Sequence, residues 1–165
     1  MSFLDGDQVT PLLPLSKHWE QIRDEYDRNS TDAISWPEPI HNGKWFVIGL
    51  RFQGQNLEAQ YKAPITSELC SSIPGAVTFG FSVMKPGCVI ERHTGYSKAV
   101  LRVHLGIHTN TSAAIEVGGE ERTWKAGQLL MFDDTQVHSA WNRGDEDRVL
   151  LLVDIKRDAI ESYLL

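Results

Sequence analysis

The sequence has little of three things that mark well-defined protein classes: cysteine, basic charge and long apolar runs. Its 165 residues include two cysteines, Cys70 and Cys88, which form no CxxC pair and are too few for a disulfide framework. Sixteen Lys and Arg stand against 22 Asp and Glu, a formal net charge of −6, which is the wrong sign for binding a phosphate backbone. We therefore expect reduced thiols and no nucleic-acid partner.

No segment approaches the roughly 18 apolar residues of a membrane span. The N-terminal stretch MSFLDGDQVTPLLPLSKHW also lacks the basic region and apolar run of a secretory signal. We expect a cytoplasmic protein without a membrane span. A chain of 165 residues can bury about 70% of its unfolded surface without disulfides, so residues 1–165 are predicted to form one domain. Nothing in the sequence indicates an oligomeric state.

Apolar residues near the N-terminus follow a helical period. Leu15, Trp19, Ile22 and Tyr26 recur at i, i+4, i+7 and i+11, which predicts an amphipathic helix over residues 14–29 with Ser16 as its cap. Further along, KWFVIGLRF reads as a strand, PITSELCSSIPG as a short helix, and AVTFGFSVMKPG as a second strand.

From residue 76 onward the pattern is strand and turn. The strand candidates are AVLRVHLGIHT, AAIEVGGEERTW with a Gly-Gly hairpin signal, GQLLMFDD, SAWNRG and RVLLLVDIKR. Short strands separated by turns, after a helical start, favour a mainly β fold of the jelly-roll type. The N-terminal helices are expected to pack on its outside.

Side-chain alternation divides the strand over residues 100–108 into two faces. Leu101, Val103, Leu105 and Ile107 lie on one face, and Arg102, His104, Gly106 and His108 on the other. The polar face is either solvated or turned toward an anionic partner, because an unpaired buried Arg costs several kcal/mol.

Two histidines each follow a glycine turn and a strand. Gly87 lies six residues before His93, and Gly127 lies eleven before His138. This arrangement resembles the two half-motifs of a cupin-like double-stranded β-helix, in which imidazoles bind Fe(II), Mn, Ni or Zn. A single strand histidine is more often structural, but two in this arrangement favour ligands. Gly95 stands where a two-His-one-carboxylate iron site has Asp or Glu.

Two further charged residues lie near this pattern. Arg148 precedes the apolar run of residues 149–153 and either clamps a carboxylate or is an ordinary charge at a strand end. Asp134, four residues before His138, either orients a ligand or is a turn residue.

The segments SVMKPGCVIERHTGYSKAVLRVHLGI, TWKAGQLLMFDDTQVHSAWN and RVLLLVDIKR resemble the aspartyl/asparaginyl β-hydroxylase family of Fe(II)/2-oxoglutarate oxygenases. The resemblance covers roughly residues 19 to 157. It implies a double-stranded β-helix that uses Fe(II), 2-oxoglutarate and O2 to hydroxylate an unactivated C–H bond. The implied substrate is the β-carbon of an Asp/Asn-type residue, a related small molecule or an acyl chain.

The resemblance also assigns roles. It implies that His93 and His138 bind the metal and that Gly95 leaves a position for water. Arg148, helped by Ser82, would bind the distal carboxylate of 2-oxoglutarate, while Arg102 and His104 would lie at its keto-acid end. Arg51 stands where family members that act on protein domains have a second aromatic residue. The alternative function is a cupin-like module that binds a metal or ligand without catalysis. A third possible function is that of a cupin isomerase or of a dioxygenase that uses no keto acid.

Overall fold

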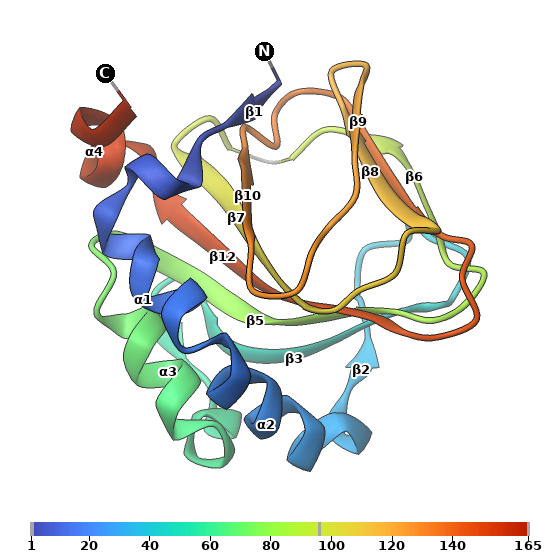
Figure 1. The fold of residues 1–165 in the computed structure, drawn as a ribbon, viewed down its shortest axis with the longest axis horizontal. Helices are drawn as coiled ribbons and strands as arrows, with labels where there is room; N and C mark the ends of the chain where they lie inside the picture. Colours follow the sequence, from blue (N-terminus) through green and yellow to red (C-terminus); the bar gives the residue numbers. More distant parts are fainter. Residues whose placement is uncertain (1, 96, 165) are drawn as a thin grey trace.

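Two antiparallel β-sheets pack face to face in the computed structural model, which describes residues 2–95 and 97–164 (Figure 1). The strands are β1 (Phe3–Leu4), β2 (Ile34–Ser35), β3 (Trp45–Phe52), β4 (Gln55–Asn56), β5 (Ala76–Met84), β6 (Val89–His93), β7 (Val100–His108), β8 (Ala113–Val117), β9 (Glu120–Arg122), β10 (Leu129–Phe132), β11 (His138–Asn142) and β12 (Arg148–Lys156). The large sheet has the order β1-β10-β7-β12-β5-β3-β2, with β4 paired to β3, and the small sheet has the order β6-β11-β8-β9. The predicted mainly β, jelly-roll fold is confirmed.

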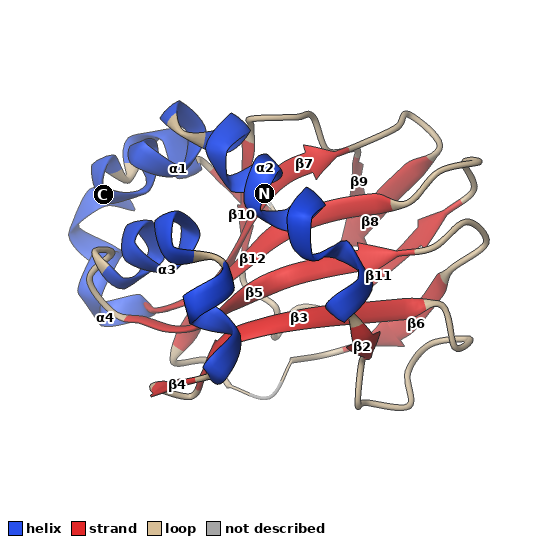
Figure 2. Cartoon of the chain, turned by 90° about the horizontal axis from the view of Figure 1, so that it is seen from below, coloured by secondary structure: helices blue, strands red, loops and turns tan. Residues whose placement is uncertain are grey.

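Helices cover the outer face of the large sheet (Figure 2). They are α1 (Leu13–Lys17), α2 (Trp19–Asn29), α3 (Pro64–Ser71) and α4 (Arg157–Ile160), with short 3-10 turns η1 (Gly6–Gln8), η2 (Thr10–Leu12), η3 (Ser30–Asp32), η4 (Glu58–Lys62) and η5 (Glu161–Leu164). Leu15, Ile22 and Tyr26 are buried between α1, α2 and the sheet, so the expectation of helices packed outside is confirmed. Among the described residues, no helix has the length and apolar character needed to cross a membrane.

The single helix predicted over residues 14–29 is two helices. The chain is already helical at Leu13, with Pro14 in the first turn, where proline is favoured, so Ser16 lies inside α1 and does not cap it. His18 has φ −109° and ψ 22° and separates α1 from α2. Its backbone still bridges them, since His18 N donates to Pro14 O and His18 O accepts from Ile22 N. The apolar stripe therefore stays on one side.

Strand β12 lies at the centre of the large sheet, between β7 and β5. Residues 148–155 are all buried. Val149, Leu151 and Val153 pack on the helix side, whereas Leu150 and Leu152 pack toward the small sheet. The strand is buried on both faces, as its apolar run predicts, and it positions Arg148 inside the molecule.

Candidate active site

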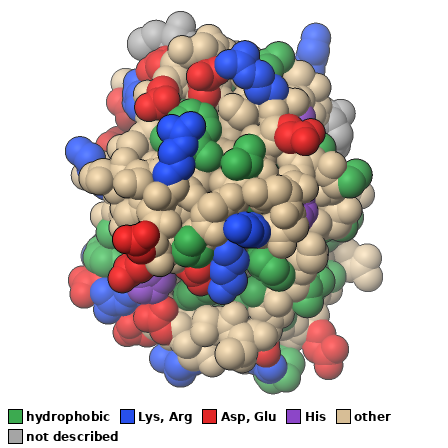
Figure 3. Space-filling view, turned by 90° about the vertical axis from the view of Figure 1, so that its right-hand side faces the viewer, with side chains coloured by type: hydrophobic (Ala, Val, Ile, Leu, Met, Phe, Trp, Pro, Cys, Tyr) green, Lys and Arg blue, Asp and Glu red, His purple; other side chains and the backbone are tan. Residues whose placement is uncertain are grey.

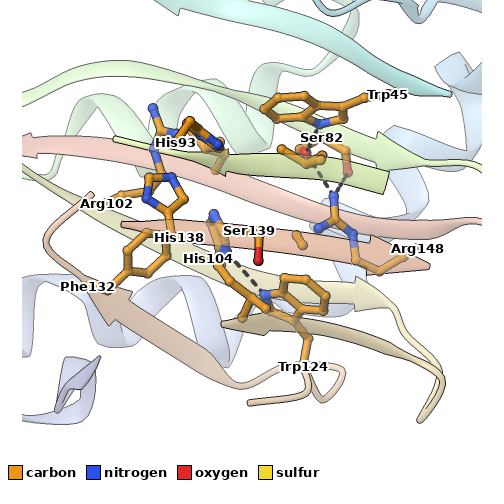
Figure 4. Close-up of a pocket in the computed structure, with 14 residues that line it drawn as sticks. Trp45, Ser82, His93, Arg102, His104, Trp124, Phe132, His138, Ser139 and Arg148 are labelled. Atoms are coloured by element: carbon orange, nitrogen blue, oxygen red, sulfur yellow. Dashed lines mark hydrogen bonds between the residues drawn. The ribbon is translucent and has the colours of Figure 1, made fainter. Parts of the chain in front are cut away.

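The two candidate ligand histidines lie side by side on the small sheet. His93 ends β6, His138 begins β11, and the two are direct cross-strand partners. Their ring centroids are 4.2 Å apart. A register shift follows in this strand pair, because His138 pairs with His93 while Ala140 pairs with Ile90. Such a bulge re-aims side chains, here at the point where both imidazoles face the interior (Figure 4).

Backbone carbonyls fix the tautomers of both rings. His93 Nδ1 lies 2.6 Å from Glu91 O, and His138 Nδ1 lies 2.8 Å from Gln136 O. A carbonyl oxygen only accepts hydrogen bonds, so each Nδ1 is protonated, and in a neutral ring Nε2 is then the nitrogen that carries the lone pair. Burial lowers the pKa of His138 to about 4. The imidazole of His138 is therefore neutral at physiological pH, the state in which histidine binds metals.

Asp134 fills the space beside Gly95. The Gly95 backbone N–H donates to Asp134 O over 2.6 Å, and a Cβ at Gly95 would overlap the Asp134 carboxylate. This carboxylate is 1% exposed, and neither oxygen has a hydrogen-bond partner among the described residues. Burial raises the pKa of Asp134, and Arg102, whose Nη2 is 3.6 Å away, opposes this effect. A buried carboxylate with unused oxygens, close to the histidine pair, suits a cationic or hydrogen-bond-donating group in the site.

Arg148 is fully buried without a carboxylate partner in the described part of the chain. Its Nη2 donates to Ser82 Oγ over 2.9 Å, and its guanidinium lies 4.5 Å from the centre of the Trp124 ring. Its Nε has no hydrogen-bond partner, and burial lowers the pKa of Arg148 to about 9. Native proteins rarely leave an arginine in this state unless a ligand supplies the missing negative charge.

Ser82 has an unused donor at the same place. Its Oγ accepts from Trp45 Nε1 over 2.9 Å and from Arg148 Nη2. A hydroxyl has two acceptor lone pairs and one hydrogen, so these bonds occupy both lone pairs and leave the Ser82 O–H free to donate. Ser82 and Arg148 together therefore offer donors to an anionic oxygen.

Trp124 fixes the orientation of His104. The Trp124 Nε1–H donates to His104 Nδ1 over 3.1 Å. An indole N–H can only donate, so His104 Nδ1 is unprotonated and the proton of the neutral ring is on Nε2. Burial lowers the pKa of His104 well below its usual value, and Arg148 and Arg102 add to the effect. His104 is thus a neutral donor that lines the pocket.

The polar face predicted for residues 100–108 is present only in part. Arg102 and His104 both line the interior pocket, but Arg102 forms a bidentate ion pair with Asp154, its cross-strand partner, at 2.8 and 3.0 Å. His108 does not share this face. A register shift in the β12–β7 pairing intervenes, and His108 Nε2 lies 2.7 Å from Asp27 Oδ1 in α2.

These side chains meet in one pocket between the sheets (Figure 4). His93 and His138 lie toward one end of the pocket and Arg148 toward the other. The cavity has a volume of about 30 Å³, which is room for about two water molecules, so a larger ligand requires side chains at its mouth to move. The structure brings together all six predicted site residues: Ser82, His93, Arg102, His104, His138 and Arg148.

The residues present fit a metal with open positions. No group of three His, Cys, Asp or Glu side chains forms a metal cage in residues 2–95 and 97–164. Two adjacent imidazoles whose Nδ1 atoms are held by backbone carbonyls, and a buried carboxylate able to accept hydrogen bonds from metal-bound water, suit a nitrogen- and oxygen-preferring divalent ion.

Among the pocket residues that the sequence did not predict, two tryptophans hold predicted site residues in place. Trp45 and Trp124 both donate indole hydrogen bonds to predicted site residues. Trp45 begins β3 and faces the interior, so alternation along that strand could have identified it. Trp124 lies outside the strands, where no periodicity applies. Cys70 and Cys88 are free, as expected, and both are buried.

Comparisons with known proteins show the family to which the chain is related. The family described as Aspartyl/Asparaginyl beta-hydroxylase matches residues 16–158. An ornithine lipid ester-linked acyl 2-hydroxylase of Rhizobium tropici is 38% identical over 129 residues, which are 76% of this chain and 45% of that protein. Human aspartyl/asparaginyl beta-hydroxylase is 30% identical over 153 residues, 86% of this chain and 20% of that protein.

The fold recurs in a solved structure at low sequence identity. A Pseudomonas putida prolyl-4-hydroxylase superposes with a TM-score of 0.55 and 16% identity, covering 84% of this chain and 86% of that one. The chain spans less than half the length of the curated relatives named above. The family match over residues 16–158 and the identities to these relatives show that the chain belongs to the aspartyl/asparaginyl β-hydroxylase family.

Proposed function

We propose that this chain is an Fe(II)- and 2-oxoglutarate-dependent hydroxylase. The observation that carries the proposal is the buried guanidinium of Arg148, which has no carboxylate partner among the described residues and an unused Nε donor. Next to it, the Ser82 hydroxyl has its hydrogen to donate. A carboxylate bound here would accept from both residues and neutralise the buried charge.

The opposite end of the pocket supports a keto acid rather than a simple carboxylate. His93 and His138 would hold the metal through Nε2, which leaves other coordination positions for the keto and carboxyl oxygens. His104 Nε2–H would donate to the proximal carboxylate, since Trp124 directs that proton into the pocket. A dicarboxylate with a keto group therefore matches the pocket. One carboxylate would meet Arg148 at one end, and the keto acid would meet the metal and His104 at the other.

We assign Arg102 a role that differs from the one the resemblance implies. Its charge is already matched by Asp154, so it adds little net attraction for 2-oxoglutarate. We assign Arg102 to positioning, because it also lies 3.6 Å from Asp134. Asp134 would accept a hydrogen bond from metal-bound water, since both of its carboxylate oxygens are without a hydrogen-bond partner among the described residues.

When bound, the metal and cosubstrate supply the oxidising chemistry: O2, 2-oxoglutarate and a C–H group give succinate, CO2 and an alcohol. The chain's residues bind the cosubstrate, keep the His138 imidazole neutral and exclude water by burial. The substrate remains either an Asp/Asn-type residue, a related small molecule or an acyl chain, since the relatives' names include both aspartyl/asparaginyl and acyl hydroxylases. Cytoplasmic location stays a prediction.

Anaerobic titration tests the proposal. Fe(II) and then 2-oxoglutarate are added to the apo protein while the weak visible charge-transfer band of the chelated keto acid is recorded. We expect a band only when both are present, its loss in His138→Ala, and its retention in His108→Ala, a histidine outside the pocket. Iron binding without a band would instead assign the chain to the non-catalytic metal-binding modules.

A further inference from the structure

A second, larger cavity adjoins the histidine pocket. It is a groove of about 630 Å³, within the size range of small-molecule sites. Ser82, Arg102 and Leu152 line both the groove and the pocket of His93 and His138. A ligand in the groove would therefore contact residues that also line the pocket of the two histidines.

Two glycines leave the floor of the groove without side chains. Gly49 on β3 and Gly80 on β5 are direct cross-strand partners, and neither has a positive φ, so conformational freedom is not what requires glycine there. A Cβ at Gly80 would lie 2.5 Å from Ile48 O, and one at Gly49 would lie 2.9 Å from Leu57 Cδ1. The two strands thus approach closely, and Leu57 forms a wall over the floor.

The walls and rim of the groove are predominantly apolar. Val47, Leu57 and Leu152 contribute aliphatic side chains, and Trp36 adds an aromatic ring. At the rim, Ile34 is 66% exposed and Phe52 is 55% exposed. On the face drawn in Figure 3, basic and acidic side chains are interspersed among the apolar ones.

The charged side chains that line the groove all have partners within the protein. Arg102 pairs with Asp154, and Asp32 pairs with Lys62. Glu38 accepts from Trp36 Nε1. Arg51 donates to Asn56, Ser71 and Ala76 O. A charged ligand would have to break one of these pairs, whereas an apolar ligand gains from burial without doing so.

We propose that the groove binds the acyl chain of a lipid and presents one of its C–H bonds to the site. The inference deepens the proposed function and rests on it for the chemistry, although chain binding itself does not depend on the metal. The apolar lining, the paired charges and the exposed rim favour a hydrocarbon chain over an acidic peptide. The exposed Ile34 and Phe52 suit contact with the lipid from which the chain comes.

Binding is tested with a chain-length series. Straight-chain N-acyl ethanolamides of 6 to 14 carbons, which have no charge, compete with a fluorescent polyene fatty acid for the apo protein. We expect the affinity to rise about fourfold per methylene until the groove is filled. Affinity that does not depend on chain length, or displacement of the probe by an Asp-containing peptide and not by the series, would overturn the inference.

Three Trp substitutions localise the site. Val47→Trp fills the groove and is expected to weaken binding of the longest chain at least tenfold. Leu57→Trp does the same from a surface loop and is the second test if Val47→Trp fails to fold. Val89→Trp makes the same change at a 50% exposed position outside both cavities and should bind as wild type. Equal affinity in all three variants contradicts the assignment.

Two further measurements separate the possible failures. The charge-transfer titration with Fe(II) and 2-oxoglutarate is repeated on each variant, and we expect the band to persist in all three. Chain binding without a band in the wild type supports the groove and refutes the proposed function, while a band without chain binding does the reverse. Phosphatidylcholine vesicles are compared with the monomeric amides, and failure of the wild type to extract a labelled chain from vesicles contradicts a lipid source.

Discussion

Asp134 occupies the space that a side chain at position 95 would need. The residue two positions after His93 is where a third protein ligand belongs in a two-His-one-carboxylate site. Here a carboxylate is present, but it comes from the turn before β11 and reaches the same space from another direction. Position 95 therefore supplies no metal ligand, and the packing of Asp134 requires a glycine there.

Restoring the conventional carboxylate should fail. In Gly95→Asp the new side chain overlaps Asp134, so we expect a loss of roughly 1–3 kcal/mol in the free energy of unfolding, as for other overpacked sites, and no gain in Fe(II) affinity. The double variant Gly95→Asp with Asp134→Gly should recover most of the loss. Urea unfolding of the apo proteins measures it; a single variant as stable as wild type with tighter iron binding would refute the packing argument.

Replacing Arg148 should weaken cosubstrate binding without lowering the stability of the apo protein. We expect Arg148→Met to leave the apo protein at least as stable as wild type, because an apolar residue replaces a buried and incompletely paired charge. The same change should raise the Kd for 2-oxoglutarate about 100-fold or more, the cost of removing one partner of a buried charged pair. Thermal unfolding and the anaerobic titration measure the two effects.

The exposed Arg143→Ala is the control for Arg148 and should change neither quantity. Arg148→Ala should likewise raise the apparent KM for 2-oxoglutarate far more than that for the hydroxylated substrate. Equal effects on both KM values, or a destabilised Arg148→Met protein with normal 2-oxoglutarate affinity, would make Arg148 a structural residue.

Trp124→Phe tests how His104 is held. The ring under Arg148 is kept but the N–H that bonds His104 Nδ1 is lost, so we expect roughly tenfold weaker 2-oxoglutarate binding from one lost hydrogen bond. Long-range ¹H–¹⁵N NMR should show the Nε2–H tautomer of His104 in the wild type and a mixture in the variant. Trp141→Phe, which removes an indole elsewhere, should leave both unchanged; a wild-type Nδ1–H tautomer would disprove the assignment.

The cysteines should resist alkylation across the physiological pH range. Burial raises the pKa of Cys88 to about 11 and that of Cys70 further, so both thiols are neutral below pH 9. At pH 8 the thiolate fraction of Cys88 is about 0.1%, and it rises tenfold per pH unit until the pKa is reached. Iodoacetamide labelling followed by mass spectrometry should modify neither residue before unfolding. Rapid labelling at pH 7 would contradict this and show that the interior around the labelled thiol opens to solvent.

Periodicity was sufficient wherever the strands are regular. The alternation along residues 100–108 correctly placed Arg102 and His104 on the same face of the strand, although it left open whether that face is solvated. The apolar run after Arg148 correctly predicted a strand buried on both faces. The same alternation failed at His108, because a register shift adds a residue that a period of two cannot anticipate.

The spacing of residues along the sequence could not predict contacts between distant segments. Asp154 lies 52 residues from Arg102, and only the sheet register makes them partners and removes Arg102 as a source of net charge for the cosubstrate. Trp124 and Trp45 likewise act through hydrogen bonds that no local pattern encodes. Ser82 was predicted as a site residue from the family resemblance alone. The structure adds a physical reason for that role: both lone pairs of its Oγ are occupied, so its O–H is left to donate to a ligand.

The two halves of the site belong to different sheets. Both candidate metal ligands come from β6 and β11 of the small sheet, whereas Ser82, His104 and Arg148 come from the large sheet. A metal and cosubstrate bound together would therefore act as a reversible cross-link that fastens one layer of the sandwich to the other. Binding of the metal and cosubstrate would then be thermodynamically linked to the packing of the two sheets. Each ligand that binds only the packed state would shift the folding equilibrium toward that state by mass action.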